Sequence, residues 1–350
     1  MEGPMSHRWL VSVGALAVVV AVVSRTPARV VGQTRPSGPT KTWSAPLTPD
    51  GHVDLEGVWD FSTITPLERP SDMKDKQVFS DEEAAAFERE ENRRQNRDLI
   101  DPQKGGGQYL PGSVIPYNEF WYERGDKIVG SKRTSLIVDP PDGRIPPLTT
   151  AAQQKADAQA AAAREEQLGR VRADSWEQRS LADRCILGFN AGPPMTPGAY
   201  NNHVQIFQTP GYVVLVTEMV HDVRIVRMDG APHPPSRLRQ YKGDSRGHWE
   251  GRTLVIDTTN FLRETSFRGS SADLHLVERL TRVDADTLVY EFRVEDPKTW
   301  TRPWAANVPM KKVPGPIYEY ACHEGNYALP NILSGARAQE RELEARPAGK

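Results

Sequence analysis

Residues 274–294 read LHLVERLTRVDADTLVYEFRV, two β-patterned runs around a short polar turn. In the second run, residues 288–294, apolar residues alternate with Glu291 and Arg293, which is typical of a strand with one buried face. The connection Asp284–Asp286 is too short for anything but a hairpin. This stretch therefore predicts two antiparallel strands.

The same period continues on both sides of this hairpin, and no helix between the runs is long enough for a parallel crossover. A meander of this kind must protect its edges, and closure into a barrel removes them. Residues 57–59 read GVW and resemble the G-x-W that opens the first strand of lipocalin-like barrels. We predict a mainly β fold, an antiparallel up-and-down, calycin- or lipocalin-like barrel, with a two-sheet β-sandwich as the alternative. The predicted strands are 55–61, 120–129, 134–138, 204–207, 212–220, 221–228, 253–258, 274–283, 287–294 and 317–322.

Helical elaborations are expected in the N-terminal half. Ser80 and Glu83 form a capping box that predicts a surface helix over residues 80–98. An Ala-rich, charged segment predicts a second helix over 150–171, and residues 175–184 continue as a short one. The predicted organisation is a signal peptide at 1–32, a flexible lead-in at 33–50, a single barrel domain at 51–340 with helical insertions at 80–98 and 150–184, and a tail at 341–350.

The N-terminal residues and the charge balance limit where the protein works and what it binds. Arg8 precedes an uncharged apolar run at residues 9–23, the layout of a secretory signal peptide. This run is short for a membrane span, which needs about 20 residues, although an uncleaved anchor is the alternative. A net charge of -2 gives no reason to expect nucleic acid. We expect a periplasmic or secreted protein with no membrane partner after cleavage, and the oligomeric state stays open.

Whether the two cysteines, Cys185 and Cys322, are oxidised depends on the compartment in which the protein resides. After export into an oxidising environment they can form one disulfide between the middle and the end of the chain. Two buried free thiols are the alternative, because spacing does not decide pairing.

Residues 243–251 read GDSRGHWEG, and the first five fit the G-x-S-x-G pattern of a hydrolase nucleophile elbow. An elbow needs a buried strand before the serine and a helix after it. Here a polar, Pro-rich segment precedes Gly243 and a β-patterned run follows Gly251. We therefore interpret this stretch as a turn-rich hairpin in which the glycines give backbone freedom, and Ser245 as no nucleophile.

The extended stretch GDSRGHWEGRTLVIDTTNF resembles the signature of a large family of secreted, largely uncharacterised bacterial proteins, abundant in acidobacteria and some proteobacteria. The segments RTSLIVDPPDGRIPPLT and YEYACHEGNY are similar to it as well, and the resemblance covers roughly residues 50–340. It implies export and a shared fold. It implies no particular activity.

Ionisable residues on apolar strand faces are the candidates for chemistry. Alternation places Glu218 with Val214 and Val216, and Glu278 with Leu276 and Leu280. A carboxylate in a barrel interior costs several kcal/mol unless it is paired or protonated. One interpretation is an acid/base site, and the other is an ion-pair network without turnover, such as Glu218–Arg224 or a Glu278–Arg279 contact. The predicted catalytic residues are Glu218, His221, Asp257, His275 and Glu278, with Arg224 and Arg279 orienting an anionic group.

Metal and cofactor motifs are not expected. No H-x-H or H-E-x-x-H pattern is present, and Glu218-x-x-His221 would need helical rather than strand spacing to form a di-iron motif. No Gly-rich phosphate loop precedes a helix. Trp300 and Trp304 could stack on a flat or sugar-like ligand at the barrel mouth, with core packing as the alternative.

These features favour an exported barrel that handles a small organic ligand. The first hypothesis is a cofactor-independent acid/base enzyme, a lyase, isomerase or hydrolase. The alternatives are a non-catalytic carrier of a hydrophobic or aromatic ligand and a cell-envelope scaffold with a filled barrel. The barrel interior distinguishes these three hypotheses. Convergent ionisable groups beside a cavity favour the enzyme, an apolar cavity favours the carrier, and no cavity favours the scaffold.

Overall fold

The computed structural model describes residues 43–73, 75–99, 118–167 and 173–345. Every element named below lies within residues 44–350. The predicted signal peptide lies outside the described residues. None of the helices in the described ranges combines the length and the apolar character that a membrane span requires.

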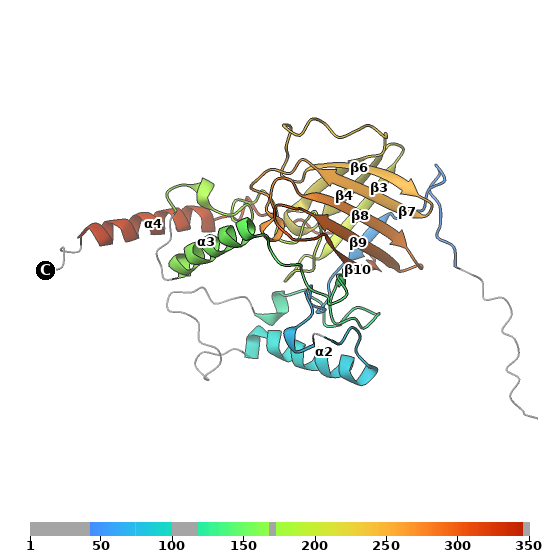
Figure 1. Ribbon diagram of the computed structural model, residues 1–350, viewed down its shortest axis with the longest axis horizontal. Helices are drawn as coiled ribbons and strands as arrows, with labels where there is room; N and C mark the ends of the chain where they lie inside the picture. The colour runs from blue at the N-terminus through green and yellow to red at the C-terminus, as the bar shows by residue number, and fades with distance from the viewer. Residues whose placement is uncertain (1–42, 74, 100–117, 168–172, 346–350) are drawn as a thin grey trace, which may run out of the picture. The chain divides into compact units, whose positions relative to one another are not determined.

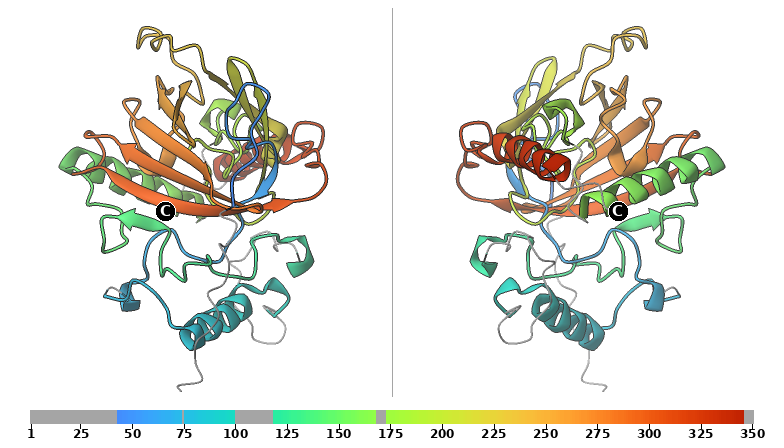
Figure 2. Two further views of the ribbon diagram at one scale, coloured as in Figure 1. Left: turned by 90° about the vertical axis from the view of Figure 1, so that its right-hand side faces the viewer. Right: turned by 90° about the vertical axis from the view of Figure 1, so that its left-hand side faces the viewer.

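The strands form one ten-stranded sheet, and nine of them close into a barrel (Figures 1 and 2). The order is β1-β3-β4-β5-β6-β7-β8-β9-β10, and β10 pairs back onto β1, while β2 adds to β10. The prediction of a mainly β barrel is confirmed, and the closure excludes the two-sheet sandwich. The strands are β1 Gly57–Asp60, β2 Ile137–Asp139, β3 His203–Thr209, β4 Tyr212–Thr217, β5 Asp222–Arg227, β6 Asp244–Glu250, β7 Thr253–Thr259, β8 His275–Arg282, β9 Thr287–Glu295 and β10 Trp304–Val313.

One strand pair departs from the predicted up-and-down pattern. All other pairs are antiparallel, but β5 and β6 run parallel and meet at Arg227 and Arg246. The Pro-rich link 228–243 makes this connection without a helix. A Cβ atom on Gly247 would lie 2.4 Å from the Met228 sulfur and 2.8 Å from a Val226 methyl, so any side chain at this position would force these neighbours to shift. The stretch interpreted as a turn-rich hairpin does belong to the β6–β7 hairpin, but its residues 244–250 form a strand, and of its three glycines only Gly243 and Gly251 have positive φ.

Two predicted strands are wrong, and two strands, β6 and β10, were missed. Residues 120–129 contain no strand, and residues 317–322 contain none either. The barrel is closed instead by β10, in which alternate residues from Trp304 to Met310 are buried. Pro309 and two lysines make this run look unlike a strand, yet Pro309 pairs opposite Val289 in register.

The helices lie outside the sheet. Ser80 accepts a hydrogen bond from the Glu83 N–H, and Glu83 accepts one from the Ser80 N–H, so the capping box is confirmed. Residues 175–184 contain a short 3-10 turn rather than the predicted helix, and helix α4 was not predicted. The helices are α2 Asp81–Gln95, α3 Thr150–Gln167 and α4 Ala328–Ala345; the 3-10 turns are Ser71–Met73, Arg97–Leu99, Glu119–Trp121, Trp176–Gln178, Met219–His221 and Phe267–Gly269.

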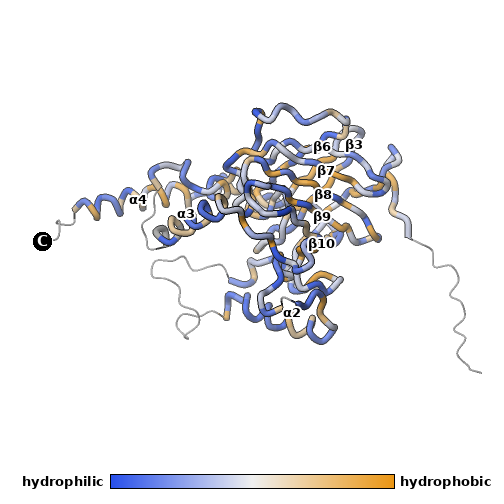
Figure 3. The backbone as a smooth tube through the Cα atoms, in the orientation of Figure 1, coloured by the Kyte–Doolittle hydropathy of each residue, from blue (hydrophilic) through white to orange (hydrophobic). Residues whose placement is uncertain are grey.

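Large side chains fill the barrel interior. Trp59, Tyr290, Phe292 and Trp304 are each 1% exposed or less, and the apolar residues concentrate in the strands while α2 is mostly hydrophilic (Figure 3). Trp300 and Trp304 pack edge to face, with ring centroids 5.8 Å apart. Both tryptophans are buried, as the core-packing alternative states, so an accessible site must lie elsewhere.

Candidate functional site

The five predicted catalytic residues fall in three separate places. Glu278 lies inside the barrel, and Asp257 and His275 lie on the outer face of β7 and β8. Glu218 and His221 belong to the connection between β4 and β5. The structure therefore offers three candidate sites rather than one.

The interior site is a sealed ion pair. The Arg224 guanidinium donates to both oxygens of Glu278, at 2.7 and 2.9 Å, and the Tyr290 hydroxyl donates to Oε1 at 2.6 Å. Burial by itself would lower the pKa of Arg224, but the Glu278 carboxylate raises it. Burial and the same carboxylate raise the pKa of Tyr290 well above its usual value. Both Glu278 oxygens therefore accept hydrogen bonds from Arg224, and Oε1 accepts a further one from Tyr290, as the ion-pair alternative expects.

Arg279 is not part of that cluster. It points outward from β8 and donates to Glu250 at 2.6 Å. Both partners are well exposed, so this pair is a surface ion pair. Neither predicted arginine is therefore placed to orient a substrate beside Glu278.

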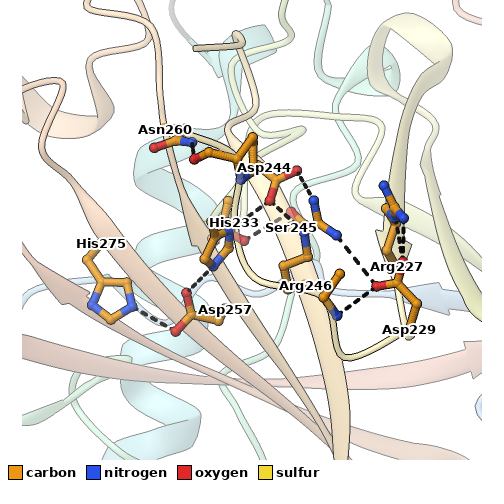
Figure 4. A network of polar contacts seen from close by, with 12 residues as sticks. Arg227, Asp229, His233, Asp244, Ser245, Arg246, Asp257, Asn260 and His275 are labelled. Atoms are coloured by element: carbon orange, nitrogen blue, oxygen red, sulfur yellow. Dashed lines mark hydrogen bonds and ion pairs between the residues drawn. The ribbon is translucent and has the colours of Figure 1, made fainter. Parts of the chain in front are cut away.

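The outer site is a chain of alternating acids and bases across β6, β7 and β8 (Figure 4). Asp257 lies 2.8 Å from His275 Nε2 and 2.9 Å from His233 Nε2, and His233 Nδ1 lies 2.7 Å from Asp244. Arg246 donates to Asp244 in turn, at 2.7 Å. The hydrogen bond to Asp257 raises the pKa of His275. Because His233 belongs to the link 228–243, this chain clamps the parallel connection onto the barrel wall.

Ser245 lies next to this chain but takes no part in it. Its side chain is buried and its hydroxyl lies 3.0 Å from the Thr258 hydroxyl. The serine is thus a cross-strand contact, in line with its interpretation as no nucleophile.

The strand-face argument for Glu218 is wrong. In β4 the buried residues are Val213, Leu215 and Thr217, and the strand ends at Thr217, so Glu218 does not continue the face of Val214. His221 is exposed, and its Nδ1 lies 3.2 Å from the Tyr320 carbonyl oxygen. The two residues do not form the predicted acid/base couple.

Glu218 instead pairs with His203. Glu218 is 4% exposed; its Oε2 lies 2.7 Å from His203 Nδ1, and its Oε1 accepts the Tyr318 N–H at 3.1 Å. Burial would raise the pKa of Glu218, but the hydrogen bonds from His203 and Tyr318 lower it. The same hydrogen bond raises the pKa of His203 against the effect of partial burial. The pair is therefore a coupled acid and base.

The hairpin β3–β4 brings these two residues together. Val204 lies opposite Thr217, and one step further the Glu218 N–H donates to the His203 carbonyl oxygen at 2.9 Å. On its other side His203 lies opposite Asp60, at the end of β1. The pair thus lies where three strands begin or end, at one end of the barrel.

A third ionisable group, Glu123, comes from the irregular segment that was predicted as a strand. The Glu123 N–H donates to the Ala199 carbonyl at 3.0 Å, and the Asn202 amide donates to the Glu123 carbonyl at 2.9 Å. These bonds place it so that one ligand atom each of Glu123, His203 and Glu218 lie within 4.8 Å of one another. Two carboxylates and an imidazole could hold a divalent ion such as zinc or manganese.

Two pockets open beside these groups. One, of about 540 Å³, is lined by His203, Asp60 and Glu123 among others. The other, of about 550 Å³, has Trp121, Glu123, Tyr200, Asn201 and Tyr320 as its described lining residues. Glu123 therefore stands between the two. The barrel-end site, as we call it below, comprises Glu123, His203, Glu218, Tyr200, Asn201 and Tyr320.

The backbone around the barrel-end site is unusual. Asn201 and Val220 have φ of 54° and 63°, and φ is also positive at Cys185 and His221. A left-handed conformation is rare for a β-branched residue and tends to mark functional sites. The disulfide between Cys185 and Cys322 is present and fixes the segment that contains Tyr318 and Tyr320. The segment predicted as a last strand thus completes this site instead.

Sequence reasoning missed His203, Glu123, Tyr200 and Tyr320 as site residues. His203 had a usable signal, because counting outward from the turn at Pro210–Gly211 pairs Thr209 with Tyr212 and, at the far end, His203 with Glu218. The other three lie in irregular segments without a period.

Comparison with known proteins gives no family assignment: no protein-family model and no curated protein matches the chain. The interpretation of the barrel-end site therefore rests on its geometry.

Proposed function

We propose that this protein is an exported barrel that handles a small organic molecule and acts on it by acid/base catalysis at the barrel-end site. The proposal rests on the 2.7 Å contact between His203 Nδ1 and the buried Glu218 Oε2. His203 is the proton-transferring residue, and Glu218 is its positioning residue.

The geometry supports a division of roles. Glu218 engages Nδ1 of the imidazole and is itself held by the Tyr318 N–H, which fixes the orientation of the ring. His203 lines the 540 Å³ pocket, so its remaining nitrogen, Nε2, is the atom for exchange with a bound molecule. With its pKa raised, His203 starts as the proton donor to an oxygen of the substrate and is restored by a proton from substrate or water. This scheme suits a lyase, isomerase or hydrolase.

Two observations support export. The apolar run at residues 9–23 has the layout of a secretory leader. A disulfide that joins residues 137 positions apart belongs in an oxidising compartment. The resemblance to a secreted bacterial family agrees with both.

The filled interior argues against the carrier alternative, and the pockets at the barrel end argue against the scaffold alternative. A carrier that encloses its ligand needs internal space, whereas Trp59, Tyr290 and Trp304 occupy the interior. A scaffold needs no pocket, whereas two pockets of more than 500 Å³ flank His203 and Glu123. An acid/base site at the barrel end accounts for both facts.

The test combines a titration with a substrate panel. In NMR, the His203 pKa should lie above the ordinary value of about 6.5 and fall in Glu218→Gln. Hydrolysis of p-nitrophenyl esters and deuterium exchange of small carbonyl compounds in D₂O cover the reaction classes. Any turnover should fall about 100-fold or more in His203→Gln and stay unchanged in the exposed neighbour variant His221→Gln. A normal His203 pKa, or turnover that survives His203→Gln, contradicts the proposal.

The same preparations test a metal as the second candidate, which the Glu123–His203–Glu218 grouping favours. Metal analysis of natively purified protein and Mn²⁺ or Zn²⁺ titration of wild type and Glu123→Gln decide it. Stoichiometric metal that is lost in Glu123→Gln would assign these residues as ligands, and His203 would then not act as the proton carrier.

A further inference from the structure

The 550 Å³ pocket of the barrel-end site has a distinctive lining. Three of its five described residues are aromatic, Trp121, Tyr200 and Tyr320, and the others are Asn201 and Glu123. Glu123 is the one charged residue among them, and no ion pair to its carboxylate is found in the described part of the chain. We infer that this pocket binds an organic cation, an alkylammonium group on a small apolar body, and presents it to the His203–Glu218 pair. Only the second half of this inference, the presentation of the cation to the His203–Glu218 pair, rests on the proposed function.

The electrostatics favour a cation over an anion. The faces of aromatic rings carry negative charge density and attract ammonium groups, most strongly where water is excluded. Glu123 adds a carboxylate, and the nearby imidazole of His203, within 4.8 Å in the same cluster, is already paired with the Glu218 carboxylate. An anionic ligand would meet these carboxylates without a cationic partner from the described lining.

The arginine that follows Glu123 in the sequence already has other partners. The Arg124 guanidinium lies 4.1 Å from the centroid of the Tyr122 ring and pairs with Glu119 at 3.3 Å. It therefore does not neutralise Glu123. Its position over Tyr122 also provides, one residue away, an example of a cation bound by an aromatic face in this segment.

The aromatic walls are held in place before any ligand binds. The Tyr200 and Tyr320 rings are nearly parallel, at 17° with centroids 6.4 Å apart, and Phe189 packs edge-on against Tyr200 at 5.4 Å. The disulfide at Cys322 anchors this irregular segment two residues from Tyr320. A preorganised wall loses little conformational entropy on binding, which favours affinity.

The volume and the atoms of the lining favour an organic ion over a metal ion. Aromatic carbons offer no lone pairs, and of the described lining only Glu123 and Asn201 provide the side-chain oxygens that hard ions prefer, apart from the phenols. A pocket of this size matches those of small organic ligands. The metal grouping uses Glu123 from its other side, toward His203, so the two ligands would compete for one carboxylate.

Calorimetric titration with choline tests the inference, against 3,3-dimethyl-1-butanol as the uncharged molecule of the same shape. Choline should bind at least tenfold more tightly than the alcohol, and Glu123→Gln and Tyr320→Leu should each weaken choline by about tenfold. Tyr327→Leu, which changes an exposed tyrosine outside the pocket, is the matched control and should bind as wild type does. Thermal unfolding of each variant establishes that it is folded.

The outcomes separate this inference from the proposed function. Equal binding of choline and the alcohol, no binding of choline at millimolar concentration, or an unchanged Glu123→Gln variant overturns the cation site. The His203→Gln substitution removes the acid/base group but leaves the pocket. If this variant still binds choline more tightly than the alcohol, the cation site is upheld even where the turnover tests fail. Turnover that depends on His203 but is not inhibited by choline overturns the second half of the inference, the presentation of the cation to the His203–Glu218 pair.

Discussion

Two buried carboxylates in this barrel meet a basic partner in opposite settings. Glu278 is sealed inside and held by Arg224, whereas Glu218 lies at the barrel end and is held by His203, whose side chain is 26% exposed. A guanidinium does not release its proton in a protein, but an imidazole exchanges protons near neutral pH. Burial of a carboxylate therefore identifies a candidate catalytic residue. The identity of its basic partner, and the access of that partner to solvent, decide whether proton transfer is possible.

The sharpest way to test this contrast is to break the sealed pair. Arg224→Met leaves Glu278 charged and buried without its partner, and the free energy of unfolding should fall by about 3–5 kcal/mol. Denaturant unfolding at neutral pH measures the loss. The double variant Arg224→Met/Glu278→Gln should recover more than half of it, because the amide is neutral and can still accept the Tyr290 hydrogen bond.

The neighbouring residue gives a matched control. Arg279→Met removes the exposed pair with Glu250, and such pairs contribute less than about 1 kcal/mol. If Arg224→Met costs no more than Arg279→Met, the interior pair is not sealed, and the contrast with the barrel-end site fails.

A second, smaller effect should follow from opening the disulfide. Cys185 and Cys322 close a loop of 137 residues in sequence, and Cys185→Ser/Cys322→Ser should lower the free energy of unfolding by about 2–4 kcal/mol. The barrel-end site should also lose local order in addition to this global loss of stability, because the Tyr318 N–H, which holds Glu218, lies in the segment that the disulfide fixes. NMR should show a lower His203 pKa in this variant, with the interior pair unchanged. Wild-type protein whose unfolding midpoint does not move on reduction would contradict the prediction.

The regular barrel strands, which hold the interior pair, were more predictable from the sequence than the irregular segments at the barrel end. The barrel was predictable because period-two runs such as Leu274–Val294 report one buried face directly, and Glu278 was placed correctly in that face. Glu218 was assigned to the wrong face, because alternation was extended past Thr217, where the strand ends. The burial of Glu278 was therefore predictable, but its partner was not, since Arg224 comes from β5, on the far side of the closed sheet.

The barrel-end site was harder for a physical reason. Glu123 and Tyr320 lie in segments whose conformation is fixed by tertiary contacts, a backbone hydrogen bond to Ala199 and a disulfide at Cys322, and not by local pattern. Nothing in a single sequence reports such contacts. His203 alone could have been found, by counting the hairpin register outward from its turn.

The smallest predicted effect is the pH dependence of the barrel-end pair. The raised pKa of His203 stabilises the fold below its unfolded pKa of about 6.5, and this contribution is lost as pH rises through the folded value. The lowered pKa of Glu218 stabilises the fold above about 4.5, and that contribution is lost as pH falls through the folded value. His203→Gln should therefore lose the most stability, about 1 kcal/mol, between roughly pH 4.5 and 6.5, and less on either side. Unfolding free energies from pH 4 to 9 measure this, with His248→Gln, which removes an exposed His–Glu pair, as the control. A difference between wild type and His203→Gln that is flat across this range would mean that His203 and Glu218 do not titrate as a coupled pair, and the contrast with the interior pair would fail.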